Sequence, residues 1–85
     1  MCTMIAEKLA ATGAAKGAAG WFPLDHAYVS YDHPFELALE HALNLDFVNE
    51  AAGLATRVSV ELTRETARAL AQGILAALEA SEGVD

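Results

Sequence analysis

The chain has 85 residues, of which 54% are hydrophobic, and its 12 acidic and 5 basic residues give a net charge of −7. This length holds a single domain, residues 1–85, and the few scattered basic residues argue against binding to nucleic acid or to an anionic membrane. There is no apolar leader segment and no run of about 18 apolar residues, so we expect a cytoplasmic protein that does not span a membrane.

The apolar content is high for so short a chain. A domain of this size buries only about 60% of the surface that its unfolded chain exposes, so much apolar area would stay in contact with water. We therefore expect a homo-oligomer, in which another copy covers part of that area. The single cysteine, Cys2, excludes an intrachain disulfide.

Two interpretations stand for the first residues. Residues 4–11 have helical propensity, but a segment this short is not stable as an isolated helix. Apolar residues at alternate positions favour a strand over about 3–12, with Glu7 as the exception. Residues 13–20 are small and glycine-rich and predict a flexible loop. The aromatic pair Trp21 and Phe22 then predicts a plug over the core or an anchor for a partner.

Three further segments predict strands. Residues 26–33 alternate and are rich in aromatic and β-branched side chains, and Pro34 ends this strand because it cannot donate a hydrogen bond to a neighbour. Alternation continues over 35–47 and indicates a strand from about 41 to 49, with a helical turn over 35–42 as the alternative for its first part. Residues 50–56 form a turn-rich link, and residues 57–62 alternate again as a strand.

The last segment predicts a helix. Thr63 is placed to cap it, because its hydroxyl can accept a hydrogen bond from the backbone N–H of Thr66. Gly83 is expected to end the helix, and Gly73 would permit a close approach to the sheet or to a second helix. Apolar residues form a stripe at helical spacing: Ala67, Leu70, Ala71, Ile74, Leu75 and Leu78.

These elements predict an α+β fold, a small antiparallel β-sheet of three to four strands packed on one face by the C-terminal α-helix. One helix covers one face of a sheet. The second face, which carries Tyr28, Ser30, Asn44 and Asp46, is then either exposed to water or the surface of a dimer.

The histidines are the residues with the clearest potential for chemistry. His33 and His41 are expected on adjacent strands, where opposite side chains are about 5 Å apart and can share one metal ion. A third ligand would come from Cys2, an acidic residue or a second copy, and His26 is a further candidate. The sulfur atoms near the N-terminus suit zinc or copper. The plainer interpretation is that each histidine is a hydrogen-bonded, partly buried side chain.

Three functions follow as hypotheses. The first is a homo-oligomeric protein that binds a metal ion or small ligand near His33 and His41. The second is a small enzyme in which these histidines act as acid or base, assisted by Cys2 or by an aspartate, for which Asp25, Asp32 and Asp46 are the candidates. The third is an accessory subunit that binds another protein through Trp21 and Phe22. Neither a phosphate-binding loop nor a hydrolase or dinucleotide motif is present.

Several runs along the chain resemble a known family. They are Met1-Cys2-Thr3, Trp21-Phe22-Pro23-Leu24, Tyr31-Asp32-His33-Pro34 and Leu45-Asp46-Phe47-Val48-Asn49-Glu50-Ala51. Together they are similar to short bacterial proteins of a domain-of-unknown-function family, and the similarity covers nearly the whole chain. The resemblance implies a small stand-alone domain and supplies no catalytic residue.

Overall fold

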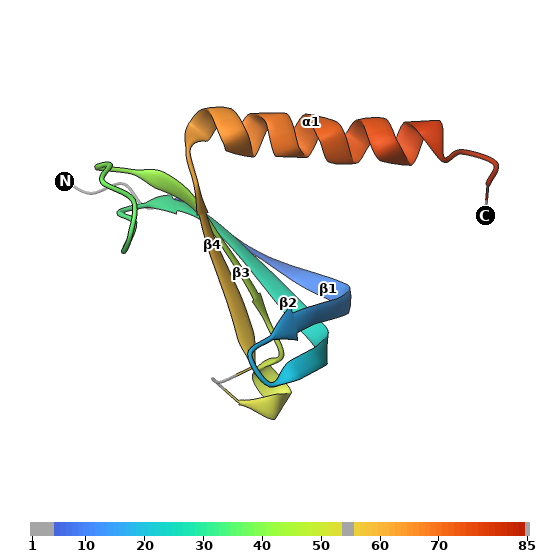
Figure 1. Ribbon diagram of the computed structural model, residues 1–85, viewed down its shortest axis with the longest axis horizontal. Coiled ribbons are helices and arrows are strands. Elements are labelled where there is room, and N and C mark those ends of the chain that lie inside the picture. Colours follow the sequence, from blue (N-terminus) through green and yellow to red (C-terminus); the bar gives the residue numbers. More distant parts are fainter. Residues whose placement is uncertain (1–4, 54–55, 85) are drawn as a thin grey trace.

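The computed structural model describes residues 5–53 and 56–84. Its elements are β1 (Ile5–Gly17), β2 (Gly20–Asp32), β3 (Ala42–Val48), the 3-10 turn η1 (Glu50–Ala52), β4 (Arg57–Leu62) and α1 (Arg64–Ala80). The strands form one antiparallel sheet in the order β1-β2-β3-β4, and α1 follows on from β4 to lie across the sheet (Figure 1). The predicted α+β fold is confirmed.

The first hairpin is longer than the sequence predicted. β1 and β2 have 13 residues each, and their pairing runs to Gly17↔Gly20, so the expected loop over residues 13–20 was wrong. Gly20 has φ 122°, a conformation that glycine adopts readily and that lets the chain reverse in a tight turn. A side chain at position 17 would come within 3.3 Å of the Phe22 ring, so glycine leaves room for that ring.

A β-bulge interrupts this hairpin. Ala10 pairs with His26 and Gly13 pairs with Leu24, so β1 contains one more residue than β2 over this stretch. A bulge bends its strand and increases the local twist, and β1 changes direction here in Figure 1. Asp25 lies opposite the bulge, at the point where the hairpin folds over.

The two faces of the sheet differ in polarity because successive strand residues point to opposite sides. One face carries apolar side chains that lie opposite one another on β2, β3 and β4: Ala27, Val29, Tyr31, Leu43, Leu45, Phe47, Val58, Val60 and Leu62. Some of these residues line a cleft together with residues of α1, so this apolar face is the one on which α1 lies. The opposite face carries Tyr28, Ser30, Asn44, Asp46, Ser59 and Glu61.

Residues 33–41 form an irregular connection, and β3 begins at Ala42, so neither the strand alternation over 35–41 nor the helical turn continues into regular structure. The cause lies in β4. The Glu61 carboxylate accepts hydrogen bonds from the backbone N–H groups of Phe35, Glu36 and Leu37, at 2.6, 2.9 and 3.1 Å. Those donors are therefore not available to a neighbouring strand or to a helix.

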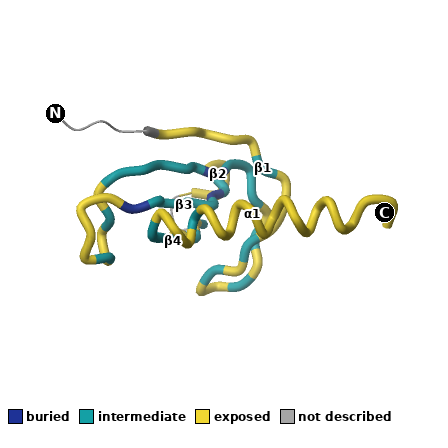
Figure 2. Tube along the Cα trace, turned by 90° about the horizontal axis from the view of Figure 1, so that it is seen from above, coloured by how far each residue is buried: buried dark blue, intermediate teal, exposed yellow. Residues whose placement is uncertain are grey.

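The helix begins as predicted, since the Thr63 hydroxyl accepts from the Thr66 N–H at 3.1 Å. It ends at Ala80, three residues before Gly83. Ala67 is the half-buried residue of α1 and the rest of the helix is exposed, as Figure 2 shows by its colour. Among the described residues the buried hydrophobic side chains are Ala27, Ala42 and Val48, so the core is small. No described helix has the length and apolarity needed to cross a membrane.

Candidate functional site

The structure separates the candidate metal ligands into two places. His33 and His41 lie together at the end of the sheet where the irregular connection leaves β2. His26 lies seven residues back along the extended chain, a distance of roughly 23 Å along the strand. Cys2 is outside the described residues.

His33 and His41 are stacked. Their ring centroids are 4.8 Å apart with an interplanar angle of 26°, and His41 also stacks on Tyr31 at 5.7 Å. The Arg64 guanidinium lies 4.7 Å from the centre of the Tyr31 ring, and so completes a column of four side chains. The His33 Nδ1 donates to the Glu40 carbonyl oxygen at 2.7 Å.

This stacking has a consequence for metal binding. An imidazole binds a metal through a ring nitrogen, with the ion in the plane of the ring. The nearly parallel planes of His33 and His41 lie side by side, so one ion could be shared only after one ring rotates out of the stack. In the observed conformation the pair acts as packing between the connection and β2.

A second cluster brings three ligand-type side chains together near the middle of β2, where η1 packs against it. The His26 Nδ1 is 3.1 Å from the Asp25 Oδ1 and 3.0 Å from the Glu50 Oε1. Within the described part of the chain, these three residues form the group whose metal-ligating atoms all lie within 4.8 Å of one another. Asp25 and His26 are half-buried, and Glu50 is exposed.

The fold positions this cluster by pinning η1 against β2. The Asp25 carboxylate accepts from the backbone N–H groups of Glu50 at 3.0 Å and Ala51 at 3.2 Å, which are the free donors at the start of the turn. Asn49 caps the same turn by accepting from the Ala52 N–H at 3.0 Å, and its amide donates to the Pro23 carbonyl at 2.9 Å. These bonds fix the backbone from which the Glu50 side chain extends.

Glu50 is also held from its other side. The Tyr28 hydroxyl donates to its Oε2 at 2.5 Å, and the Lys8 ammonium lies 3.3 Å from its Oε1. The bond from Tyr28, followed by Lys8, keeps the pKa of Glu50 below its usual value. That bond also raises the pKa of Tyr28, and hydrogen bonding to Tyr28 and Glu50 raises the pKa of Lys8.

Asp25 is ionised for a different reason. The backbone N–H of Glu50 is the largest of the contacts that lower the pKa of Asp25, with smaller contributions from Ala51 and His26. At neutral pH the cluster therefore contains two carboxylates, and the neighbouring Lys8 compensates one of their charges.

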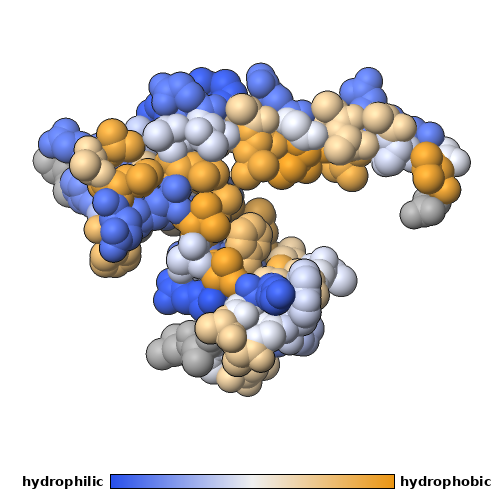
Figure 3. Space-filling view, viewed as in Figure 1, coloured by the Kyte–Doolittle hydropathy of each residue, from blue (hydrophilic) through white to orange (hydrophobic). Residues whose placement is uncertain are grey.

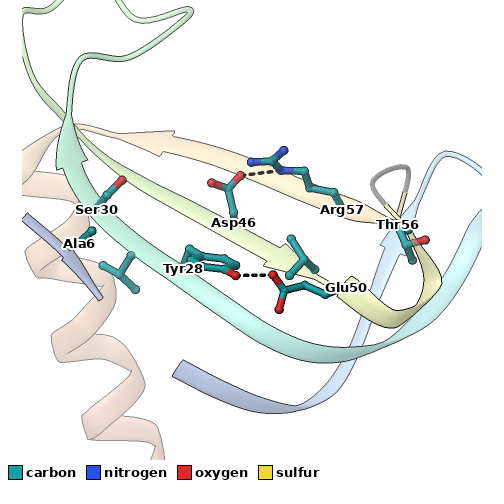
Figure 4. Close-up of a pocket in the computed structure, with 10 residues that line it drawn as sticks. Ala6, Tyr28, Ser30, Asp46, Glu50, Thr56 and Arg57 are labelled. Atoms are coloured by element: carbon teal, nitrogen blue, oxygen red, sulfur yellow. Dashed lines mark hydrogen bonds and ion pairs between the residues drawn. The ribbon is translucent and has the colours of Figure 1, made fainter. Parts of the chain in front are cut away.

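An open cavity of about 600 Å³ adjoins the cluster on the polar face of the sheet (Figure 4). Tyr28 and Glu50 form part of its wall, and Val48 is an apolar part of its lining. Further along the wall, the Asp46 carboxylate accepts from the Arg57 Nε at 3.2 Å. The cavity wall thus carries a positively charged hydrogen-bond donor, Arg57, and negatively charged acceptors, Asp46 and Glu50.

Sequence reasoning missed Glu50 and did not connect Asp25 with His26 as a ligand pair. Asp25 was a candidate acid or base, and Glu50 lay in a link without any assigned role. Glu50 meets these residues only because η1 folds back onto β2, across 25 residues of chain. The asparagine before Glu50 is a good cap for a helical turn, but a cap gives no information about what the turn packs against.

The chain belongs to DUF6295, a family of unknown function, whose model matches residues 1–84. This match confirms the resemblance to a domain-of-unknown-function family. No curated protein and no solved structure matches the chain. The family has no assigned activity, and the geometry of the side chains is what bears on the function.

Proposed function

We propose that this protein is a small metal-binding protein that holds zinc through Asp25, His26 and Glu50, with room for a small ligand beside the ion. The observation that supports this proposal is the convergence of one imidazole nitrogen and two carboxylate oxygens within 4.8 Å. This mixture of nitrogen and oxygen ligands suits zinc, whereas copper(I) prefers sulfur.

The distances are close to those of a tetrahedral site. Zinc binds nitrogen and oxygen at about 2.0–2.2 Å, which places ligand atoms about 3.3 Å from one another. His26 Nδ1 lies 3.1 and 3.0 Å from the two carboxylate oxygens. The imidazole nitrogen and each carboxylate oxygen would therefore have to separate by only a few tenths of an ångström, and all three ligand atoms already lie within 4.8 Å of one another.

The charges also favour a cation. The lowered pKa values of Asp25 and Glu50 mean that neither carboxyl has to release a proton at neutral pH before it binds a metal. The ion would take the place of the proton between His26 and the carboxylates. Lys8 competes for the Glu50 Oε1, while Tyr28 holds the Oε2 and keeps the carboxylate oriented.

Three protein ligands leave a fourth tetrahedral position for water or a small molecule. The cavity of about 600 Å³ shares Tyr28 and Glu50 with this region and provides the space for such a ligand. Arg57 and Asp46 on the same wall would select a ligand with both a hydrogen-bond donor and an acceptor.

Isothermal titration of metal-free protein with zinc tests the proposal. We expect His26→Ala to weaken binding by more than the roughly 10- to 100-fold loss that follows removal of an outer-shell partner. Lys8→Ala should strengthen binding, because it removes the competing cation. The matched control is the double variant His33→Ala/His41→Ala, which should bind zinc like the wild type. Loss of binding in that control, with His26→Ala unaffected, would place the metal at the stacked pair and reject the proposed ligands.

A second candidate function is supported by the tip of the first hairpin. Trp21 is 71% exposed there, whereas Phe22 packs towards Gly17. An exposed tryptophan at a projecting tip is typical of an anchor for another protein. If the chain is an accessory subunit, Trp21→Ala should release a co-purifying partner while Phe22→Leu should not. Retention of the partner by Trp21→Ala would reject this anchor.

A further inference from the structure

Helix α1 has an apolar face that the sheet leaves mostly uncovered. The largest side chains on this face are Leu70, Ile74, Leu75 and Leu78, and they are 45%, 52%, 66% and 62% exposed. Figure 3 shows an apolar band along the side of the helix that faces the sheet. In Figure 1 the C-terminal part of α1 projects beyond the strands, so no strand of the described residues packs against it.

The first half of α1 borders a cleft of about 510 Å³ instead of a closed core. Val29, Leu43 and Leu62 line the cleft from the apolar face of the sheet, and Leu70 and Ile74 line it from the helix. The helix therefore meets the sheet near its N-terminus and leaves a wedge-shaped apolar space that continues into the uncovered band.

The accessible surface of the single chain indicates how much area a partner would have to bury. A folded monomer of 8.9 kDa is expected to expose about 4,800 Å². This chain exposes 6533 Å², and its radius of gyration is 14.5 Å where about 12 Å is expected for a compact chain of this length. The excess of about 1,700 Å² is within the range of about 1,000–2,500 Å² that each subunit of an obligate homodimer buries.

The charges on α1 suit a second copy of the same helix in the opposite direction. Its basic residues, Arg64 and Arg68, are in the first turns and outnumber Glu65 there, while Glu79 lies in the last turn and Glu82 follows it. An antiparallel pair brings the basic end of each helix to the acidic end of the other. It also aligns the two helix dipoles favourably.

We propose that two copies associate through α1 about a two-fold axis near Ile74, so that each helix covers the apolar cleft and the overhanging band of the other. Such a contact is self-complementary and closed, which limits the assembly to a dimer. It involves the apolar face of the sheet and leaves the Asp25, His26 and Glu50 cluster on the other side of the molecule. The inference therefore goes beyond the proposed metal site and does not depend on it.

Sedimentation equilibrium of the full chain tests the dimer. The wild type should have twice the mass of 8.9 kDa at micromolar concentration. Ile74→Glu should raise the dissociation constant by at least about 30-fold, the effect of losing a central interface residue. Ala69→Glu, on the face of the helix opposite the apolar stripe, is the matched control and should remain dimeric. A wild type that stays monomeric, or an Ile74→Glu variant that dimerises normally, would overturn the proposal.

Charge reversal tests the antiparallel direction separately. Arg68→Glu and Glu79→Arg should each weaken the dimer, and the double variant should restore it, because the pair is reconstituted across the interface. The antiparallel arrangement would be rejected if neither single variant weakened the dimer, or if the double variant formed a weaker dimer than either single variant. Circular dichroism of each variant should match that of the wild type, since all the substituted positions are exposed in the single chain.

Discussion

Replacing Gly73 by alanine should stabilise the protein. Gly73 lies in the middle of α1, where glycine costs about 0.8–1.0 kcal/mol relative to alanine. A Cβ atom added at this position meets nothing within 4 Å, so no steric term opposes the gain. For a domain of this size, 1 kcal/mol corresponds to a rise in melting temperature of roughly 4–8 °C.

Urea denaturation followed by circular dichroism measures this gain, at one fixed protein concentration because dimerisation would couple to unfolding. Ala69→Gly, at an exposed position of the same helix, is the reciprocal control and should lose a similar amount. Gly73 lies about 130° around the helix from the centre of the apolar stripe, on the flank away from Leu75, Arg68 and Glu79, and so outside the proposed interface. If Gly73→Ala is destabilising, another chain approaches the helix at Gly73, and both this prediction and the Ile74-centred dimer would be refuted.

Three further substitutions test individual hydrogen bonds. Thr63→Ala should cost about 1 kcal/mol of stability in urea denaturation while Thr63→Ser costs little, and equal losses would show that the hydroxyl is not the cap. Glu61 has a lowered pKa because backbone N–H groups bond its carboxylate, so its stabilisation is present above about pH 4.5 and is lost as the pH falls through the folded pKa. Glu61→Gln should therefore lower the melting temperature at pH 7 more than at pH 3, and a constant difference contradicts the argument. Tyr28→Phe should raise the pKa of Glu50 towards its usual value in a carboxyl NMR titration, and an unchanged pKa would mean that the bond does not persist in solution.

Sequence patterns predicted correctly those strands and helix ends that depend on residues close together in the sequence. The alternation over 57–62 matches β4 residue for residue, because a strand with one face towards a helix needs an apolar side chain at every second position. The Thr63 cap was equally predictable, since the hydroxyl and its partner, Thr66, are three residues apart. The same kind of signal gave β3 to within one residue at each end.

The errors occurred where a distant residue determines the conformation. Residues 13–17 have weak strand propensity, yet they pair with β2 because a tight turn at Gly20 brings the two strands into register. The connection over 33–41 alternates like a strand, but three of its backbone N–H groups donate to the Glu61 carboxylate, which is 24 to 26 residues away in the sequence. These N–H groups cannot then pair with a neighbouring strand. The proximity of His33 and His41 was expected, although stacking of the rings was not.

The two-residue period of the sheet also connects the two proposals. It directs Val29 and Leu45 to the face that α1 covers and Tyr28 and Asp46 to the face that holds the cavity. A dimer that closes the apolar face would bury no part of the polar one, so each subunit of the pair would keep an accessible metal site. The expected stoichiometry is therefore one zinc per chain in the wild type, and the monomeric Ile74→Glu variant should bind zinc with the same affinity. Loss of zinc binding on conversion to monomer would mean that the second copy contributes to the metal site.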